Sequence, residues 1–268
     1  MTEPATVVFF HAHPDDEAIL TGGTMARLAA GGHRVVLVVA TRGELGETPE
    51  GVLLPGQTLA LRRTAETLWS ADILGVARVE FLDYRDSGMA GTVDNNAPDA
   101  FCRASVQEAA DRLAKIVDAE SATALVIYDD HGGYGHPDHV QVHRVGTSAA
   151  STRPHLGLYE ATMNRDHMRR GLEQLAAIDP TIAPPSLPDD FGEPETAITH
   201  AVDVRAFSSQ KRRAMAAHTS QIAETSIFLS LPKPAFDQGF GFEWFIERRP
   251  DGAGVFTELT SVEPAAAT

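Results

Sequence analysis

The sequence predicts an α/β protein with a Rossmann-like open parallel sheet and crossover helices, followed by a smaller C-terminal α/β subdomain. Short apolar runs alternate with longer helical patterns, as expected when helices join the strands of a parallel sheet. Glycines follow two of the helical patterns, at positions 31–32 and 75, where helices commonly end. With 268 residues, 43% of them hydrophobic, the chain is long enough to bury its own core.

The N-terminal half is expected to alternate strands and helices. An apolar run at 7–10 indicates the first strand, and Pro14, which suits the first turn of a helix, indicates the first helix. Another apolar run, at 124–127, indicates the fourth strand. The expected strands span residues 6–11, 34–40, 78–83 and 124–128. The expected helices span residues 15–30, 58–74, 103–119 and 137–150.

The C-terminal half begins near residue 155 and contains a Pro-rich, acidic connection at 178–195. The elements expected beyond it are a strand at 197–204, a helix at 205–219 and a late strand at 240–247. We expect a metal-binding catalytic domain, a subdomain that covers the active-site crevice, and a disordered tail. These three parts span residues 1–154, 155–262 and 263–268.

Composition excludes several classes of function. A formal net charge of −15 would repel nucleic acid and anionic membranes, so a small neutral or cationic substrate is expected. No apolar run reaches about 18 residues, the length of a membrane-spanning helix, and no secretory segment is evident. The single cysteine, Cys102, is expected to be a small core residue of a cytoplasmic protein. The sequence leaves a homo-oligomer open.

The most informative motif follows the first strand and reads His-Ala-His-Pro-Asp-Asp-Glu, residues 11–17. Pro14 favours an extended His13 and begins a helix whose dipole favours nearby carboxylates. His13 and Asp16 can then converge on one cation, with Asp15 beside them. Imidazole nitrogens and carboxylate oxygens suit zinc, and iron(II) would accept the same ligands. On this motif alone, an acidic helix start preceded by packed histidines explains the residues equally well.

A second polar cluster follows the fourth strand, at residues 128–139. It ends in His-Pro-Asp-His at 136–139, which repeats the His-Pro-Asp pattern of the first motif. Because ligands bind at the carboxyl ends of parallel strands, the two motifs can form one site. Three protein ligands with one water are typical of catalytic zinc, whereas four form a structural site, which a chain of this length does not need. The possible ligands are His13, Asp16, His136 and His139.

The two motifs resemble those of the LmbE/PIG-L superfamily of zinc-dependent N-deacetylases. The resemblance rests on Ala-His-Pro-Asp-Asp-Glu at 12–17, Gly-Gly-Tyr-Gly-His-Pro-Asp-His at 132–139 and Arg-Asp-Ser-Gly-Met-Ala-Gly-Thr at 85–92. It covers roughly the first 150 residues well and the rest in outline. Within the superfamily, the chain most resembles the mycothiol branch, which contains N-acetylglucosaminyl-inositol deacetylases and mycothiol S-conjugate amidases.

The resemblance implies a role for each matching residue. It implies that Asp15 is the general base and that His136, as an imidazolium, stabilises the oxyanion and protonates the leaving amine. It implies that Asp138 orients His136 and that Tyr134 helps to polarise the carbonyl. The implied zinc ligands are His13, Asp16 and His139. The implied sugar contacts are Arg63, Asp86 and Met89.

These roles match the chemistry of amide hydrolysis, which needs an activated water, a stabilised oxyanion and a proton for the departing nitrogen. Zinc polarises the carbonyl and lowers the pKa of its water to about 7. An aspartate beside that water can act as the base, and a histidine paired with an aspartate can act as the acid.

Other polar residues give less specific predictions. Glu44 and Glu47 follow the second strand, where either could reach a sugar hydroxyl or a substrate amine, with solvated loop carboxylates as the alternative. His11 is expected to be held by backbone hydrogen bonds rather than to bind metal. Residues 217–221 are expected to make structural hydrogen bonds, and the loop at 91–100 is expected to act as a substrate lid.

The leading prediction is a zinc-dependent amide hydrolase that removes an acetyl group from the nitrogen of an N-acetylglucosamine-type substrate. The alternatives within this chemistry are a mycothiol S-conjugate amidase, whose expected lysine is replaced by Leu20, and a natural-product sugar N-deacetylase. A non-catalytic zinc-binding or sugar-binding module is a more distant alternative. A dinucleotide-dependent oxidoreductase is disfavoured, because the first strand lacks the Gly-x-Gly-x-x-Gly turn that pyrophosphate binding requires.

Overall fold

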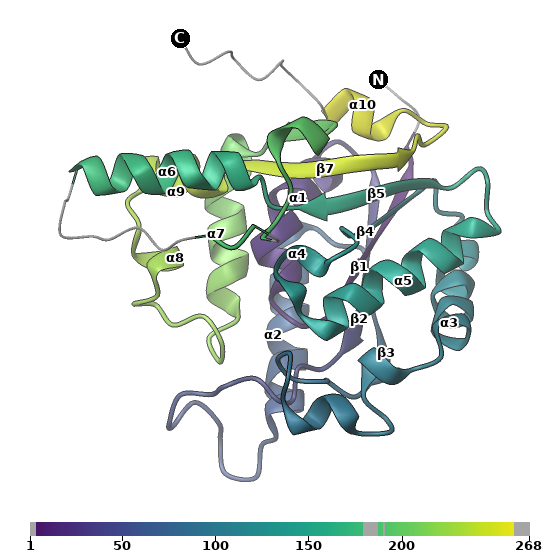
Figure 1. The fold of residues 1–268 in the computed structure, drawn as a ribbon, viewed down its shortest axis with the longest axis horizontal. Coiled ribbons are helices and arrows are strands. Elements are labelled where there is room, and N and C mark those ends of the chain that lie inside the picture. The colour runs from purple at the N-terminus through teal and green to yellow at the C-terminus, as the bar shows by residue number, and fades with distance from the viewer. Residues whose placement is uncertain (1–3, 179–186, 190, 260–268) are drawn as a thin grey trace.

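The computed structural model describes residues 4–178, 187–189 and 191–259. Within them, a mixed seven-stranded sheet runs through the molecule in the order β3-β2-β1-β4-β5-β7-β6 (Figure 1). Strands β1 to β5 are parallel, whereas β7 runs antiparallel to both β5 and β6. The strands are β1 (Thr6–His11), β2 (Arg34–Thr41), β3 (Arg78–Tyr84), β4 (Ala124–Tyr128), β5 (Gly157–Thr162), β6 (His200–Asp203) and β7 (Phe242–Arg249).

Helices cover both faces of this sheet. The α-helices are α1 (Gly22–Ala30), α2 (Leu59–Leu74), α3 (Val106–Ala119), α4 (Gly132–Gly135), α5 (Pro137–Ser151), α6 (Arg165–Ile178), α7 (Ser208–Ala217), α8 (Ile227–Ser230), α9 (Lys233–Phe240) and α10 (Val255–Leu259). A π-helix, Glu17–Thr21, precedes α1. Short 3-10 helices span Val93–Asn96, Phe101–Arg103, Glu195–Ala197 and Arg205–Phe207.

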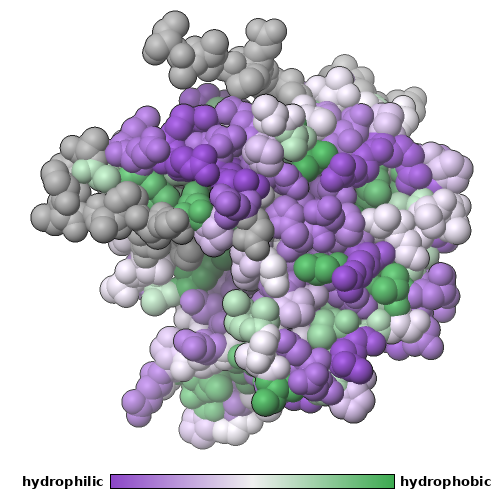
Figure 2. All heavy atoms as spheres, viewed as in Figure 1, coloured by the Kyte–Doolittle hydropathy of each residue, from purple (hydrophilic) through white to green (hydrophobic). Residues whose placement is uncertain are grey.

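Alternate residues of β1 point to opposite faces of the sheet and fill two hydrophobic cores. Val7 and Phe9 join the core formed with α1, α2 and α7, whereas Val8 and Phe10 join the core formed with α3 and α5 (Figure 1). Burial on both faces explains why these strands appear in the sequence as continuous apolar runs. Outside the cores, the face shown in Figure 2 carries mostly hydrophilic residues.

The order of the strands brings the two polar motifs together. The chain passes from β1 to β2 and β3, and then returns to place β4 on the other side of β1. Phe9 of β1 is in register with Val126 of β4, so the segments that follow these strands leave the sheet at the same edge. A crevice forms at such a switch point, and ligands of open α/β sheets bind there.

The structure confirms the predicted elements of the N-terminal half, and β1 and β4 have the predicted bounds. The first helix begins later than predicted, because Asp15 has a φ of 96°, which helical residues do not adopt. The helix predicted from residue 103 begins at Val106, because Ser105 caps it by accepting a hydrogen bond from the backbone N–H of Glu108.

The C-terminal half extends the same sheet, because β5 pairs with β4 and β7 pairs with β5. The predicted strand, helix and late strand of this half correspond to β6, α7 and β7, whereas β5 and α6 were not predicted. The boundary between residues 154 and 155 stays a prediction. The tail at 263–268 and half of the connection at 178–195 lie outside the described residues. In the described part of the chain, no helix is long and apolar enough to span a membrane.

Candidate active site

Two imidazoles and one carboxylate meet at the carboxyl ends of β1 and β4. His13 Nδ1 and His139 Nε2 each lie 3.3 Å from Asp16 Oδ2, and none of the three side chains is more than 14% exposed. Zinc bonds of about 2.0–2.1 Å at tetrahedral angles would place ligand atoms about 3.3 Å apart. Both separations therefore match those between ligands of one metal ion, and nitrogens of His13, His136 and His139 also lie within 4.8 Å of one another.

Hydrogen bonds hold both imidazoles in orientations that suit a metal. His139 Nδ1 lies 3.2 Å from the carbonyl oxygen of Gly132 and donates its proton there. This leaves the lone pair of His139 on Nε2, which is buried and has no hydrogen-bond partner among the described residues. His13 Nε2 lies 3.2 Å from Asp138 Oδ2, which leaves Nδ1 to face Asp16. A carbonyl or carboxylate behind each ring is typical of metal-binding histidines, so these residues fit a divalent cation.

The charges around the cluster attract positive charge. Burial opposes the protonated form of His13, but its hydrogen bonds with Asp138 and Asp16 outweigh burial and raise its pKa to about 10. Burial also opposes the ionised form of Asp16, yet His139 and His13 hold the pKa of that carboxyl well below its usual range. The cluster is therefore electrostatically suited to a cation.

Asp15 lies in the same turn and has an unusual backbone conformation. Its φ of 96° costs a non-glycine residue about 1–3 kcal/mol, and strain of this kind concentrates at functional sites. The backbone N–H of Asp15 donates to Glu17 Oε2 at 2.9 Å, and its Oδ2 lies 3.3 Å from Arg63 Nη2. Burial raises the pKa of Asp15 to about 6, although the Arg63 guanidinium opposes the shift. A carboxylate with a pKa near neutrality suits a general base.

His136 and Tyr134 lie beside the metal-binding histidines. The ring of His136 is 4.5 Å from that of His13 between centroids, and its Nδ1 accepts a hydrogen bond from the backbone N–H of Asp138 at 3.2 Å. Burial and the neighbouring histidines lower the pKa of His136 to about 4. Tyr134 is 47% exposed, and its ring lies 4.9 Å from that of His139. Both groups are therefore close enough to act on a substrate held at the cluster.

The loop that carries Tyr134 depends on Gly132. This residue has a φ of 69°, and a Cβ at its position would lie 2.5 Å from the Cβ of His139. Only glycine combines this backbone conformation with such a close approach. The same residue provides the carbonyl that orients His139.

The carboxylate of Asp138 contacts different partners from those expected. It was expected to orient His136, but its Oδ2 lies 3.2 Å from His13 Nε2 and accepts the backbone N–H of Ser87 at 3.0 Å. The Ser87 hydroxyl donates to its other oxygen. Of the groups of Asp138, the backbone N–H and not the carboxylate bonds to His136 in the described structure. Asp138 lies in the first turn of α5, where its carboxylate faces the turn after β1. It therefore orients His13, a candidate metal ligand.

Arg63 and Asp86, the expected sugar contacts, are both buried and bonded to the protein. Arg63 donates to the carbonyl oxygens of Gly43 and Pro14. The carboxylate of Asp86 accepts the backbone N–H groups of Leu45 and Gly88. These bonds hold the loops around the crevice, and a sugar contact by either residue stays a prediction.

The remaining expected substrate contacts lie at the surface. Met89 is 55% exposed, and Glu47 is also exposed. Glu44 is half-buried, and its Oε1 accepts the backbone N–H of Asp86 at 3.0 Å, so one of its oxygens has a structural role. Cys102 is half-buried rather than part of the core.

Sequence reasoning missed the pairing of Glu17 with His218. The two side chains are fully buried, and His218 Nε2 lies 2.7 Å from Glu17 Oε1. Burial opposes the ionised form of Glu17, but His218 holds its pKa below the usual range. Glu17 ends the first motif and structural hydrogen bonding was predicted for 217–221, but no sequence pattern linked the two segments. Ser220, in this segment, also bonds to Glu66, which confirms that prediction.

His11 does not belong to the metal cluster. Its two ring nitrogens lie 2.9 Å from the Tyr128 hydroxyl and 2.8 Å from the Thr21 hydroxyl. The prediction that His11 is held by hydrogen bonds is confirmed, although its partners are side chains rather than backbone groups. Tyr128 also stacks on His139, with ring centroids 4.4 Å apart, so it supports both motifs.

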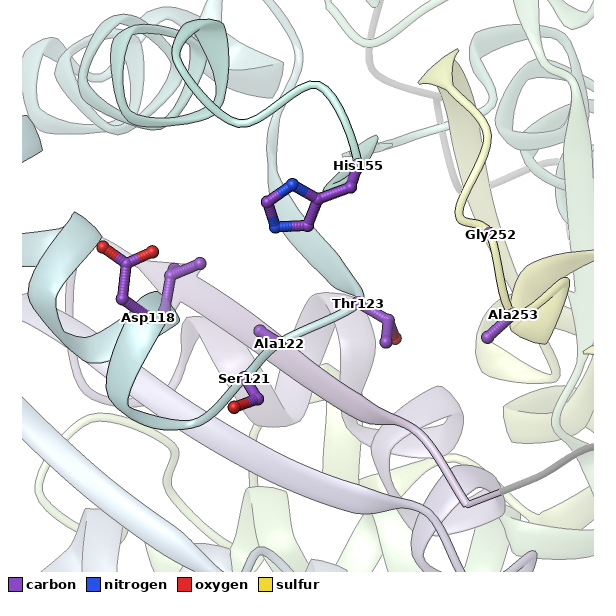
Figure 3. A pocket seen from close by; sticks show the side chains of 8 residues that line it. Asp118, Ser121, Ala122, Thr123, His155, Gly252 and Ala253 are labelled. Carbon is purple, nitrogen blue, oxygen red and sulfur yellow. The ribbon is translucent and has the colours of Figure 1, made fainter.

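Two surface cavities lie outside this cluster. One, of about 730 Å³, lies at the opposite edge of the sheet, where His155, Asp118 and Thr123 line it (Figure 3). The other, of about 700 Å³, lies at the carboxyl ends of β2 and β3, where Glu44 and Tyr84 line it. The second cavity adjoins the crevice through Glu44, whereas the first contains none of the candidate site residues.

Proteins with similar sequences identify the family of this chain. The sequence profile of the family described as PIG-L: GlcNAc-PI de-N-acetylase matches residues 8–150. A 1D-myo-inositol 2-acetamido-2-deoxy-alpha-D-glucopyranoside deacetylase from Acidothermus cellulolyticus is 39% identical over 95% of this chain and 94% of its own length. A protein of the same name from Geodermatophilus obscurus is 38% identical over 91% of this chain and 92% of its own length.

Solved structures share the fold at lower sequence identity. N,N'-diacetylchitobiose deacetylase from Pyrococcus horikoshii superimposes with a TM-score of 0.62 at 22% identity, covering 98% of this chain and 88% of its own. A 4-carboxy-2-hydroxymuconate hydratase from Pseudomonas putida gives a TM-score of 0.57 at 17% identity, covering 98% of this chain and all (100%) of its own. Because a deacetylase and a hydratase share the fold, the fold alone does not specify the reaction. The matched residues and the relatives at the sequence level show that this chain belongs to the PIG-L family of GlcNAc-PI de-N-acetylases.

Proposed function

We propose that the chain is a metal-dependent amide hydrolase that removes the acetyl group from the nitrogen of an N-acetylglucosamine-type sugar. The observation that carries the proposal is the position of Asp16 Oδ2, 3.3 Å from both His13 Nδ1 and His139 Nε2, with Asp15 in the same turn. The names of the relatives make an N-acetylglucosaminyl-inositol the first substrate to test.

The ligands of the metal would be His13, Asp16 and His139. Two nitrogens and one oxygen suit zinc, and iron(II) is the second metal to test. When bound, the cation supplies Lewis acidity, which polarises the amide carbonyl and makes water more acidic.

Asp15 is the general base in this proposal. Its carboxylate accepts a proton from the attacking water, and the water oxygen forms a bond to the carbonyl carbon. Arg63, 3.3 Å from Asp15 Oδ2, favours the ionised form and limits the directions in which the carboxylate can turn. When the carbon–nitrogen bond breaks, the carboxyl group of Asp15 can return its proton to the departing amine, and acetate is released.

His136 stabilises the oxyanion. Its Nδ1 accepts the backbone N–H of Asp138, so the neutral ring carries its proton on Nε2 and can donate it in a hydrogen bond to the developing charge. This differs from the imidazolium that the resemblance implied, and it leaves Asp15 as the proton donor for the leaving amine. Tyr134, on the adjacent loop, is exposed enough to move toward the carbonyl and donate a second hydrogen bond.

A small-molecule substrate and a cytoplasmic location are parts of the same proposal. The net charge of −15 disfavours nucleic acid and anionic membranes as partners. The single cysteine, Cys102, favours a reducing compartment.

The test is a mass-spectrometric assay of the zinc-loaded and iron(II)-loaded protein. The substrates are N-acetylglucosaminyl-inositol, a mycothiol bimane conjugate and simple N-acetylglucosamine glycosides. We expect loss of acetyl from N-acetylglucosaminyl-inositol. Cleavage of the conjugate alone would favour the S-conjugate amidase, and cleavage of simple glycosides alone would favour another sugar deacetylase. If no substrate loses its acyl group, the glucosaminyl assignment is wrong.

A further inference from the structure

The Glu17 carboxylate joins the turn after β1 to the C-terminal half of the chain. One oxygen, Oε1, accepts hydrogen bonds from the Ser70 hydroxyl at 2.5 Å and from His218 Nε2 at 2.7 Å. The other oxygen, Oε2, accepts the backbone N–H of Asp15 at 2.9 Å. Glu17, Ser70 and His218 have no exposed surface (0%). The hydrogen bonds of this carboxylate to Ser70 and His218 are therefore shielded from water.

The bond to the Asp15 N–H bears on the catalytic carboxylate. Asp15 has a φ of 96°, a conformation that a non-glycine residue keeps only when its surroundings hold it there. Glu17 Oε2 holds the N–H of Asp15, and Arg63 holds its carboxylate at 3.3 Å. These two contacts act at opposite ends of the residue, so together they determine where its side chain points.

His218 is itself held in place by its neighbours. It follows α7, and the next two residues, Thr219 and Ser220, donate hydrogen bonds to the Glu66 carboxylate on α2. His218 uses only Nε2 in this network, because its Nδ1 has no hydrogen-bond partner among the described residues. The segment therefore presents one nitrogen of His218 to Glu17 from a fixed backbone.

We propose that Glu17 and His218 are positioning residues, which hold the backbone of Asp15 in its left-handed conformation and so aim its carboxylate at the substrate water. The catalytic part of this inference rests on the proposed function, in which Asp15 is the base. It gives the C-terminal half a specific contribution to the reaction, made through a buried contact rather than through a lid.

A second buried ion pair provides a matched control. Lys211 Nζ lies 2.6 Å from Glu243 Oε1, each side chain being 1% exposed. This pair also joins the two halves, because Glu243 accepts the backbone N–H groups of Gly23 and Thr24. It makes no contact with Asp15 in the described structure. If the Glu17–His218 pair had only a structural role, removing it and removing the Lys211–Glu243 pair would affect turnover to the same extent.

The kinetic test compares His218→Leu with His218→Gln. Leucine removes the donor, whereas the side-chain amide of glutamine can place an N–H near the position of His218 Nε2. We expect His218→Leu to lower kcat by about 10²-fold, the effect of misplacing a catalytic group by about 1 Å. KM and the bound zinc, measured by mass spectrometry, should stay near wild type. His218→Gln should recover most of kcat, and the control Lys211→Met/Glu243→Gln should lower the Tm without lowering kcat.

A less disruptive variant, Ser70→Ala, tests the same proposal if His218→Leu does not fold. Ser70→Ala removes one donor to Glu17 and leaves no charge unpaired, so we expect a loss in kcat of roughly 2-fold to 10-fold with KM unchanged. An unchanged kcat in folded, zinc-loaded Ser70→Ala and His218→Leu would overturn the catalytic part of the proposal. Equal losses of kcat in His218→Leu and His218→Gln would also overturn it.

A crystal structure of Glu17→Met tests the positioning independently of turnover. Methionine is close to glutamate in size but has no oxygen to accept the backbone N–H of Asp15, so we expect Asp15 to leave its positive φ. If Asp15 keeps its positive φ in this variant, the positioning proposal is wrong, whatever the activity. If wild type does not deacetylate any substrate but Asp15 moves in the variant, the proposed function fails while the positioning stands.

Discussion

At the scale of residues, the candidate site consists of groups that hold one another in fixed orientations. His139 is oriented by the Gly132 carbonyl, His13 by Asp138, and Asp15 by Glu17 and Arg63. Such outer contacts commonly change metal affinity or rate by 10-fold to 100-fold when they are removed. We therefore expect the reaction to depend on residues that orient the proposed metal ligands and base, as well as on those groups themselves.

Asp138→Asn tests which histidine Asp138 serves. Because the carboxylate contacts His13 Nε2 and Ser87, we expect the variant to bind zinc about 10-fold to 100-fold more weakly, as measured by competition with a chelating dye. The matched control is Asp130→Asn, an exposed aspartate in the same region, which should keep wild-type zinc affinity. Unchanged zinc affinity in Asp138→Asn, with a loss of kcat alone, would instead support the pairing with His136.

The sequence predicted which residue types form the site, but not all of their contacts. The spacing of His13, Asp16 and His139 relative to two strand ends was enough to bring them together, since parallel strands end at one edge. The partner of Asp138 was not predictable in this way, because it depends on how α5 is oriented against the turn after β1. The contact between Glu17 and His218 spans 201 residues, and no local pattern encodes it.

At the scale of elements, α5 determines where His139 lies, and its close approach to β4 depends on Gly146. A Cβ at Gly146 would overlap the side chain of Ile127.

We expect Gly146→Ala to lower the free energy of unfolding by about 1–3 kcal/mol through overpacking. Gly171→Ala, in α6, is the matched control, because nothing lies within 4 Å of a Cβ there. That variant should be neutral or up to about 1 kcal/mol more stable. Urea denaturation measures both changes, and equal stability of the two variants would contradict this packing.

Elements with strong local signals were predictable, and those that depend on distant contacts were not. β1 and β4 were predicted to the residue because buried parallel strands are continuous apolar runs. β5 was missed, although it is buried throughout, because its apolar character is interrupted by Glu160, which is paired with Arg248. The π-helix after Asp15 was missed because it depends on the positive φ of that residue.

At the scale of the whole molecule, the sheet continues from one half of the chain into the other. β7 lies between β5 and β6, and buried residues of β1, β6 and β7 share one core. The predicted subdomain therefore shares its sheet and core with the N-terminal half. We expect the two halves to unfold together, so a histidine buried in the C-terminal half should affect the stability of the whole protein.

His200, on β6, provides such a test. Burial lowers its pKa below the ordinary value of 6.5, so the unfolded chain binds this proton more readily than the folded chain does. Its contribution to the free energy of unfolding is complete above pH 6.5 and decreases as the pH falls toward the folded pKa. When the pH is lowered from 7.5 to 5.5, we expect the Tm of His200→Asn to fall by less than the Tm of wild type. His155→Asn, which changes an exposed histidine, should keep the wild-type slope, and an identical slope in His200→Asn would contradict the prediction.

The most direct test of a deacetylase site at this cluster is the rate of acetate release from N-acetylglucosaminyl-inositol by zinc-loaded wild type and Asp15→Ala. If the metal cluster and the adjacent carboxylate form a deacetylase site, wild type releases acetate and Asp15→Ala loses about 10²-fold to 10⁴-fold in kcat. Because Asp15 is not among the proposed metal ligands, both proteins should contain the same amount of zinc. An Asp15→Ala rate equal to that of wild type, at equal zinc content, would contradict the claim.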